Sequence, residues 1–262
     1  MTLQVLLSAM HLKDESYLDT LHVTSDAVVI NQCDRTARKE VRRDANGHAQ
    51  QVLYIESTQR GLSRSRNMAI RNARADICIL CDNDVEYVDD YEEMILSAFE
   101  ENPEADLIVF YIRRKEKPVP NYPAKRWMNY LSVMKIFSPE IAFRRKSIEG
   151  ISFQESFGAG SGKYLMGEEN IFLYDCLKAE KKILYMPLMI AELREEESTW
   201  FQGYNRRFFI SRGAGYAAMS KLFSFVLIWQ FAIRKRSLYR SETGFFKALK
   251  YMFEGRREYL GK

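Results

Sequence analysis

The sequence predicts an α/β fold in which helices flank a mostly parallel sheet, followed by a C-terminal amphipathic helical extension. Short apolar runs rich in β-branched residues recur through the first half of the chain, and stretches with helical periodicity separate them. This alternation is typical of βαβ units and therefore of parallel strands. Near residue 213 the composition changes to a long apolar stretch and then a basic tail, which predicts the extension.

The first half of the chain supplies most of the expected sheet. The expected strands there cover 3–8, 27–32, 52–55, 77–81 and 107–112. The expected helices between them lie near 14–21, 62–74 and 90–101. Because ligands of parallel sheets bind beyond the carboxyl ends of the strands, the residues that follow each strand are candidates for a site.

A second group of elements follows a basic, proline-containing excursion over 113–139. It consists of a strand over 141–144, a glycine-rich loop at 158–162, a helix over 168–180 and a strand over 183–186 that Pro187 ends. The loop is not a phosphate-binding P-loop, because that motif needs glycine where Phe157 stands and serine or threonine where Tyr164 stands.

The C-terminal segment is first apolar and then basic. Residues 222–233 are nearly all apolar, and the basic triplet 234–236 follows at once. Twelve residues are too few to cross a hydrocarbon core of about 30 Å, and extending the run back to Ala214 encloses Lys221. We expect a helix that lies in the membrane interface with its basic residues on anionic headgroups. A buried core helix and a spanning helix are the alternatives.

Composition limits the class of protein. With 47% hydrophobic and 28% charged residues, the chain is neither disordered nor fibrous. Cys78 and Cys81 lie three apart in an expected strand, so their thiols face opposite sides, which argues against a zinc or redox pair. The basic residues cluster beside an apolar helix and not along an aromatic platform, so no nucleic-acid partner is expected. Without a basic leader at the start of the sequence, we expect a cytoplasmic protein, peripheral on the inner face of the cell membrane.

Two carboxylates follow the fourth expected strand, in the sequence Cys81-Asp82-Asn83-Asp84-Val85. Residues two apart in an extended segment point to the same side, where the two charges repel unless a cation lies between them. Mg²⁺ and Mn²⁺ prefer oxygen ligands and leave positions open for phosphate oxygens. Asp82 and Asp84 are therefore the predicted metal ligands, and an acidic turn without metal is the alternative.

An arginine is expected on the inner face of the helix over 62–74. Helical spacing places Leu62, Arg66, Ala69 and Ala73 together, so Arg66 is the one charge on a small apolar face. An inward arginine needs a carboxylate or a phosphate as its partner. Asp82 or Asp84 is the expected carboxylate, in a structural ion pair or near a donor site.

These motifs together resemble a known family. The segment Arg60-Gly61-Leu62-Ser63-Arg64-Ser65-Arg66-Asn67, followed by a strand and the Asp82–Asp84 pair, resembles the G-x-x-x-A-R-N and D-x-D motifs of family 2 glycosyltransferases with the GT-A fold. Ser65 stands where the family usually has alanine. The resemblance covers roughly residues 1–210 and points to the type that builds bacterial capsules and exopolysaccharides. It makes residues 1–212 a GT-A catalytic domain and residues 213–262 a membrane-associating extension.

The resemblance also assigns the general base. The family carries a G-E-D or E-D motif whose aspartate is the base, and here Gly167-Glu168-Glu169 stands in that place. Glu169 matches the base and Glu168 the preceding acid, although either could take the proton. A carboxylate suits removal of a proton from an attacking hydroxyl. Two acids at a helix N-terminus also favour the helix dipole, which is the alternative explanation.

A donor-binding set is implied as well. Because the second expected strand ends in Asn31-Gln32-Cys33-Asp34 and lacks the usual paired aspartates, either Asn31 or Asp34 contacts the nucleotide base. The whole set is Asn31, Asp34, Arg60, Arg66, Asn67, Asp82 and Asn83. Farther along, Trp200 is expected on an acceptor sugar, and Arg206 and Arg207 near phosphate, with a solvated helix start as the alternative.

The predicted function is metal-dependent, inverting transfer of a sugar from a nucleotide sugar, UDP-linked by preference, to a saccharide or a polyprenyl-linked oligosaccharide. Two alternatives are a sugar-phosphate nucleotidyltransferase and a non-catalytic sugar-binding relative at a membrane surface. Residues 6–13 lack the glycine-rich basic loop that such a nucleotidyltransferase usually carries.

Overall fold

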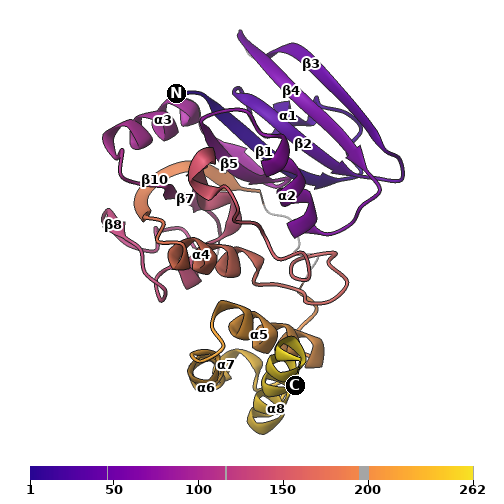
Figure 1. The fold of residues 1–262 in the computed structure, drawn as a ribbon, viewed down its shortest axis with the longest axis vertical. Coiled ribbons are helices and arrows are strands. Elements are labelled where there is room, and N and C mark those ends of the chain that lie inside the picture. Colours follow the sequence, from indigo (N-terminus) through magenta and orange to yellow (C-terminus); the bar gives the residue numbers. More distant parts are fainter. Residues whose placement is uncertain (46, 116, 195–200, 262) are drawn as a thin grey trace. The chain divides into compact units, whose positions relative to one another are not determined.

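The computed structural model describes the chain except for residues 46, 116, 195–200 and 262 (Figure 1). The described residues form two compact units. The first contains residues 1–60, 64–152 and 176–196, and the second contains residues 61–63, 153–175 and 197–262. The first unit thus holds the sheet, and the second holds the C-terminal helices.

The first unit is built on a mixed sheet. The strands described are β1 (Leu3–Met10), β2 (Asp26–Gln32), β3 (Ala37–Ala45), β4 (His48–Ser57), β5 (Ile77–Asp82), β6 (Val85–Tyr87), β7 (Leu107–Arg113), β8 (Arg126–Trp127), β9 (Ile141–Arg144) and β10 (Ile183–Leu193). Their order is β3-β4-β2-β1-β5-β9-β7-β10-β6, and β8 pairs with β10. β4, β2, β1 and β5 are parallel, as are β7 and β10, whereas β3, β6, β8 and β9 pair antiparallel. The predicted α/β class is confirmed.

Continuous apolar runs form the parallel centre of the sheet. β1, β2, β5 and β7 are buried along nearly their whole lengths, on both faces. This pattern is typical of parallel strands, because helices cover both faces of such sheets. These strands and the helix after β6 share one hydrophobic core, which fixes the positions of the strand ends.

The hairpin of β3 and β4 is a difference from the expected fold (Figure 1). β4 is longer than the strand expected over 52–55, and β3 was not expected at all. β3 pairs antiparallel with β4 from Ala37↔Glu56 to Ala45↔His48. Because β3 is an edge strand with mostly exposed, charged residues, it lacks the apolar alternation that predicts a strand.

Among the described residues, four α-helices precede the C-terminal ones. They are α1 (Tyr17–Thr20), α2 (Leu62–Asn72), α3 (Tyr91–Glu101) and α4 (Glu168–Lys178). The helix expected near 14–21 is a single turn. α3 buries Tyr91, Ile95, Ala98 and Phe99, whose spacing places them on one face against the sheet core.

Glu140 anchors the excursion over 113–139. Its side chain is 1% exposed, and one carboxylate oxygen lies 3.8 Å from Arg114 Nη2 and 3.6 Å from Lys117 Nζ. The backbone N–H of Phe137 donates to the other oxygen at 2.9 Å. Burial raises the pKa of Glu140, and the two cations and this hydrogen bond oppose that rise. The Glu140 carboxyl group therefore contacts both ends of the excursion.

The C-terminal helices belong to the second unit. They are α5 (Arg206–Met219), α6 (Ser224–Arg234), α7 (Arg236–Tyr239) and α8 (Phe245–Leu260). The boundary expected between residues 212 and 213 lies inside α5, which begins at Arg206. The apolar run from residue 214 to 233 is divided between α5 and α6. Within the described residues, no helix combines the length and apolar character that crossing a membrane requires.

α5 and α8 cross with their backbones in contact. A Cβ atom on Gly213 would lie 1.9 Å from the carbonyl oxygen of Met252. A Cβ atom on Gly255 would lie 2.0 Å from the carbonyl oxygen of Ile210. Only glycine permits this approach, because any other residue adds an atom where the neighbouring backbone already lies. The two glycines therefore set how the C-terminal helices pack.

Candidate active site

The carboxyl ends of four parallel strands lie along one edge of the sheet. Met10 of β1 pairs with Gln32 of β2, Gln32 pairs with Ser57 of β4, and Ser8 of β1 pairs with Asp82 of β5. Polar and charged side chains follow these ends, namely Asp34, Arg60, Asp82, Asn83 and Asp84. The first unit thus gathers most of the predicted site residues at the edge where ligands of parallel sheets bind.

Arg66 and Asp82 form an ion pair inside this edge. Nη2 of Arg66 donates to both carboxylate oxygens of Asp82, at 2.9 and 3.1 Å. The side chain of Arg66 is only 1% exposed and that of Asp82 is 18% exposed. The arginine that helical spacing places on the inner face of the helix therefore pairs with a carboxylate. The pair also fixes where Asp82 points.

The turn after Asp82 is held by two residues that the sequence did not single out. The carbonyl oxygen of Asn83 accepts hydrogen bonds from the Tyr17 hydroxyl at 2.9 Å and from Arg194 Nη2 at 3.0 Å. The backbone N–H of Arg194 donates to the carbonyl oxygen of Asp84 at 2.8 Å. Arg194 therefore brings a guanidinium group to the turn that carries both predicted metal ligands.

The sequence pattern does not indicate Arg194, because it predicts that the preceding strand ends at Met186. β10 instead continues through Pro187 to Leu193. Its pairing with β7 is irregular between Tyr185 and Met189, and a proline is tolerated in a strand at such a bulge. An isolated arginine 110 positions after Asp84 carries no local sequence signal.

Asn31 is engaged in internal hydrogen bonds. Its Oδ1 accepts from the backbone N–H of Leu12 at 2.9 Å, and its Nδ2 donates to the Leu12 carbonyl at 3.0 Å and to the Tyr54 hydroxyl at 2.9 Å. The side chain is 1% exposed. Both amide protons are used, so Asn31 holds the loop after β1.

Asp34 is the more accessible of the two candidates for the nucleotide base. Its side chain is 88% exposed, and one oxygen lies 2.6 Å from Arg60 Nη2. Nη1 of Arg60 donates to the carbonyl oxygens of Cys33 at 2.8 Å and Ser57 at 3.2 Å. Arg60 therefore joins the ends of β2 and β4 and presents Asp34 at the edge of the sheet.

The buried side of α2 differs in detail from the expected one. Arg66 and Ala69 are buried as expected, whereas Leu62 and Ala73 are half-buried. Asn67 is also buried, at 4% exposure. The buried face of α2 is therefore more polar than the spacing of its apolar residues predicts.

The donor set at this edge suits a hard divalent cation. Among the described residues, no group of three or more histidine, cysteine, aspartate or glutamate side chains could hold a metal by itself. Asp82 and Asp84 offer carboxylate oxygens, and Mg²⁺ is usually bound by one or two carboxylates together with substrate phosphates. The residues therefore fit a cation that is completed by a phosphorylated ligand.

Glu168 and Glu169 belong to the second unit, at the start of α4. Glu168 is 6% exposed, and Glu169 is half-buried. A Cβ atom on Gly158 would lie 3.1 Å from the carboxyl carbon of Glu168 and 3.3 Å from the hydroxyl of Ser63. Ser63 in turn donates to the carbonyl oxygen of Phe157 at 2.7 Å. The glycine-rich loop thus packs directly on Glu168, and Glu169 is the more accessible carboxylate.

The weaker candidates near residue 200 have mixed outcomes. Trp200 lies outside the described residues. Arg206 forms an ion pair with Glu254 and lies over the ring of Tyr251, and Arg207 is exposed in the first turn of α5. Arg206 therefore has a structural partner within the second unit.

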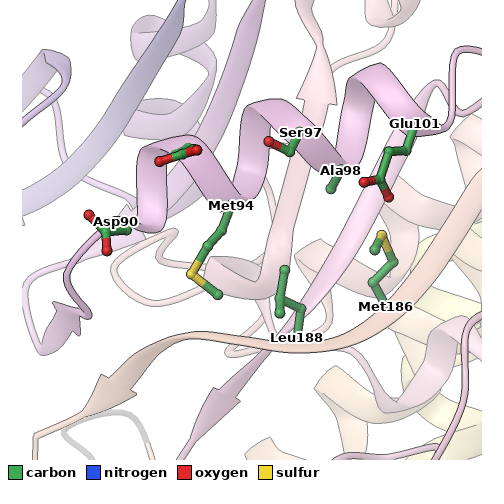
Figure 2. Close-up of a pocket in the computed structure, with 8 residues that line it drawn as sticks. Asp90, Met94, Ser97, Ala98, Glu101, Met186 and Leu188 are labelled. Carbon is green, nitrogen blue, oxygen red and sulfur yellow. The ribbon is translucent and has the colours of Figure 1, made fainter.

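Two hollows in the first unit lie away from these residues. One, of about 300 Å³, is bounded by α3 and β10, with Met94, Met186 and Leu188 in it and Asp90 and Glu101 near its ends (Figure 2). The other, of about 360 Å³, lies near the amino ends of the strands, beside residues such as Thr2, Gln4 and Asp26. Neither includes a predicted site residue.

The two cysteines of β5 are structural side chains. Cys78 and Cys81 are buried free thiols. Burial raises the pKa of Cys78 to about 12 and that of Cys81 further. Both therefore remain protonated at neutral pH and pack as small apolar side chains.

Comparisons with known proteins place this fold and site in context. The family model of glycosyl transferase family 2 matches residues 18–161. Residues 1–349 of TarS from S. aureus, in complex with UDP-GlcNAc, are 15% identical over 100% of this chain and 79% of that chain, with a TM-score of 0.61. The complex of the same fragment with UDP gives 12% identity over 97% and 81% of the two chains and a TM-score of 0.63.

A third similar structure is the mannosyltransferase PcManGT from Pyrobaculum calidifontis in complex with GDP-Man and Mn²⁺. It is 11% identical over 98% of this chain and 86% of that chain, with a TM-score of 0.52. At these identities the likeness concerns the fold. No curated protein matches the chain in sequence.

Proposed function

Since the chain belongs to glycosyl transferase family 2 and is a glycosyltransferase with the GT-A fold, we propose that it transfers a sugar, with inversion, from a nucleotide sugar to a saccharide or lipid-linked oligosaccharide. The donor class is supported by similar structures that hold UDP-GlcNAc and GDP-Man. A UDP-linked sugar is the donor we propose. Synthesis of a cell-surface polysaccharide is the setting we propose for this reaction.

The proposal depends most on the Arg66–Asp82 ion pair at the carboxyl edge of the sheet. Arg66 is buried and holds Asp82, one aspartate of the D-x-D turn. Burying this ion pair costs desolvation free energy, which two well-packed apolar residues in the same place would avoid. Such a pair is explained if the aspartate must keep one orientation. Asp84, two residues later and half-buried, shares the turn.

Asp82 and Asp84 are the residues that would hold Mg²⁺ or Mn²⁺. Bound there, a divalent cation stabilises the negative charge that develops on a leaving nucleoside diphosphate. Arg194 adds a fixed positive charge beside the turn, through its contacts with Asn83 and Asp84. Asp34, which Arg60 presents at the ends of β2 and β4, is our candidate for contact with the base or ribose.

Glu169 is the proposed general base. It accepts the proton of an acceptor hydroxyl as that oxygen attacks the anomeric carbon, and one base acting on one face of the sugar gives inversion. Its half-exposed position at the start of α4 suits contact with an acceptor. Glu168, buried against Gly158, is assigned a positioning role for the loop and the helix N-terminus.

The direct test is an assay of nucleoside diphosphate release. The protein is incubated with a panel of UDP- and GDP-linked sugars and Mn²⁺, and free nucleoside diphosphate is measured. We expect slow release from at least one donor, stimulated by the right acceptor. Release from no donor, with or without metal, would contradict the proposal.

The same assay separates the rival reaction. A sugar-phosphate nucleotidyltransferase releases pyrophosphate from a nucleoside triphosphate and leaves nucleotide sugars intact. Glu169→Gln should keep donor binding and lose acceptor-dependent turnover, because an amide cannot take the proton. A non-catalytic sugar-binding relative would show no turnover in either form of the protein.

A further inference from the structure

Helix α6 exposes a continuous apolar surface in the second unit. We define the apolar strip as Leu222, Phe223, Phe225, Val226, Trp229 and Ile233, which are 83, 65, 53, 59, 39 and 62% exposed. Their spacing of three and four residues along most of the strip keeps it on one side of the helix. Large apolar side chains gathered in this way mark an interaction surface.

The side of α6 that packs against the rest of the unit is not the side that carries the apolar strip. The opposite side of α6 buries Ser224, Leu227, Ile228 and Ala232. Arg256 of α8 donates to the Ser224 hydroxyl at 2.9 Å, which fixes that side toward α8. At the border of the strip, the ring of Phe225 lies 5.1 Å from the ring of Phe253 and that of Trp229 lies 6.4 Å from the ring of Phe245, both in α8. Phe225 and Trp229 still remain 53 and 39% exposed, so packing within the unit accounts for one face of α6 and leaves most of the apolar strip exposed.

The charged residues that flank the strip along the chain are all basic. The sequence contains no aspartate or glutamate from residue 201 to residue 241. Exposed basic side chains lie at both ends of α6, namely Lys221 before it and Arg234, Lys235, Arg236 and Arg240 after it. An apolar strip with cations at both of its ends complements a surface that is apolar below and anionic above.

We propose that the apolar strip and these basic residues dock the second unit on a bilayer that contains anionic phospholipid, with α6 lying in the interface. Trp229 and the phenylalanines enter the boundary between headgroups and acyl chains, and the lysine and arginine side chains contact the phosphates. A second copy of the chain is a poorer occupant, because a two-fold interface through the strip would bring the basic clusters together.

Vesicle binding tests this docking directly, with the full-length chain. The protein is sedimented with vesicles of phosphatidylcholine alone and with vesicles that also contain phosphatidylglycerol. We expect binding to the anionic vesicles only, weakened by salt. In a variant with Trp229 as its sole tryptophan, made by Trp127→Phe and Trp200→Phe, the emission should shift to shorter wavelength on binding.

Paired variants separate the strip from apolar surface in general. Leu222→Ser with Val226→Ser should weaken binding about tenfold or more. Val119→Ser with Leu131→Ser is the matched control, because these residues are 65 and 68% exposed in the first unit. The control should bind as the parent does. Thermal unfolding of each variant shows that it is folded.

The basic residues have a matched control as well. Arg234→Gln with Lys235→Gln should weaken binding by about fivefold per charge removed. Arg42→Gln with Arg71→Gln removes two exposed charges from the first unit and should change binding little.

Several results would overturn the proposal. They are no binding to anionic vesicles, equal loss of binding in strip and control variants, or a dimer that the strip variant dissociates while vesicle binding is absent. The last result would assign the strip to a second copy. Because these measurements record binding and not turnover, their failure would leave the proposed glycosyl transfer untouched.

Discussion

One guanidinium nitrogen of Arg66 lies 2.9 and 3.1 Å from the two carboxylate oxygens of Asp82, with the arginine almost wholly removed from water. The contact joins the middle of α2 to the carboxyl end of β5. Breaking a buried pair leaves an uncompensated charge, which costs more than the pair contributes when intact.

We therefore expect Arg66→Met to lower the free energy of unfolding by about 3 kcal/mol, because Asp82 is then left without its cation. Urea denaturation measures this change. Arg66→Lys keeps the charge but cannot reproduce the planar donor, so it should recover only part of the stability. A double variant with Asp82→Leu should be more stable than Arg66→Met alone. If the effects of the two substitutions on the free energy of unfolding were simply additive, Arg66 and Asp82 would not be energetically coupled.

Metal removal separates the roles of the two aspartates. EDTA should abolish nucleoside diphosphate release, and added Mn²⁺ should restore it. Asp84→Asn should reduce release by about 10²-fold with little change in unfolding, because one carboxylate of the proposed metal site is lost while the ion pair remains. Asp89→Asn changes an exposed carboxylate nearby and should have no effect. Full activity in EDTA would exclude a metal role for this turn.

Gly158 gives a test of how Glu168 is positioned. It has φ +97°, and an added Cβ would lie 3.1 Å from the carboxyl carbon of Glu168. Gly162→Ala is the matched control, since Gly162 has φ +80° and nothing within 4 Å of an added Cβ. Both variants should lose about 1 kcal/mol of stability from backbone strain. Only Gly158→Ala should also lose turnover. Equal turnover in the two variants would show that the position of the Glu168 side chain does not affect the reaction.

The glycines between α5 and α8 make a similar comparison. Gly213→Ala or Gly255→Ala forces two helix backbones apart, so we expect each to cost about 3 kcal/mol or more in the free energy of unfolding. In Gly215→Ala, the nearest atom to the added Cβ is 3.9 Å away, and the higher helix propensity of alanine should be neutral or stabilising. Chemical denaturation of the three variants distinguishes close packing from propensity.

The centre of the sheet could be predicted from the sequence because each parallel strand is a continuous apolar run. β3 could not be predicted in this way, since an edge strand that water surrounds needs no apolar pattern. The pair Asn46-Gly47, a typical hairpin turn sequence, was a signal that could have revealed it.

The candidate site was predictable only where its chemistry lies in one short segment. The Asp82–Asp84 turn and the arginine on α2 are local patterns, and the ion pair joins them as expected. Arg194 and Tyr17 meet at Asn83 only after the sheet has formed, so no local pattern marks them. The three internal hydrogen bonds of Asn31 also depend on the tertiary fold, so the sequence does not indicate them.

Two buried tyrosines predict how stability depends on pH. Burial is the main cause that raises the pKa of Tyr54 and of Tyr164 to about 12 each. The Tyr164 hydroxyl donates to Glu258 at 3.2 Å, and that carboxylate also disfavours the phenolate. Lys163, whose ammonium lies 5.2 Å from the ring centre, also faces this tyrosine.

Because both pKa values lie above the ordinary value of 10, folding favours the protonated phenols. Their contribution to stability is therefore complete below pH 10 and is lost as the pH rises from 10 to about 12. Urea midpoints measured across this interval should fall. Tyr54→Phe and Tyr164→Phe should each make the fall shallower, since phenylalanine has no proton to lose, and each should remove one late step from the absorbance titration of the tyrosines. An unchanged slope in both variants would assign the alkaline loss of stability to other groups.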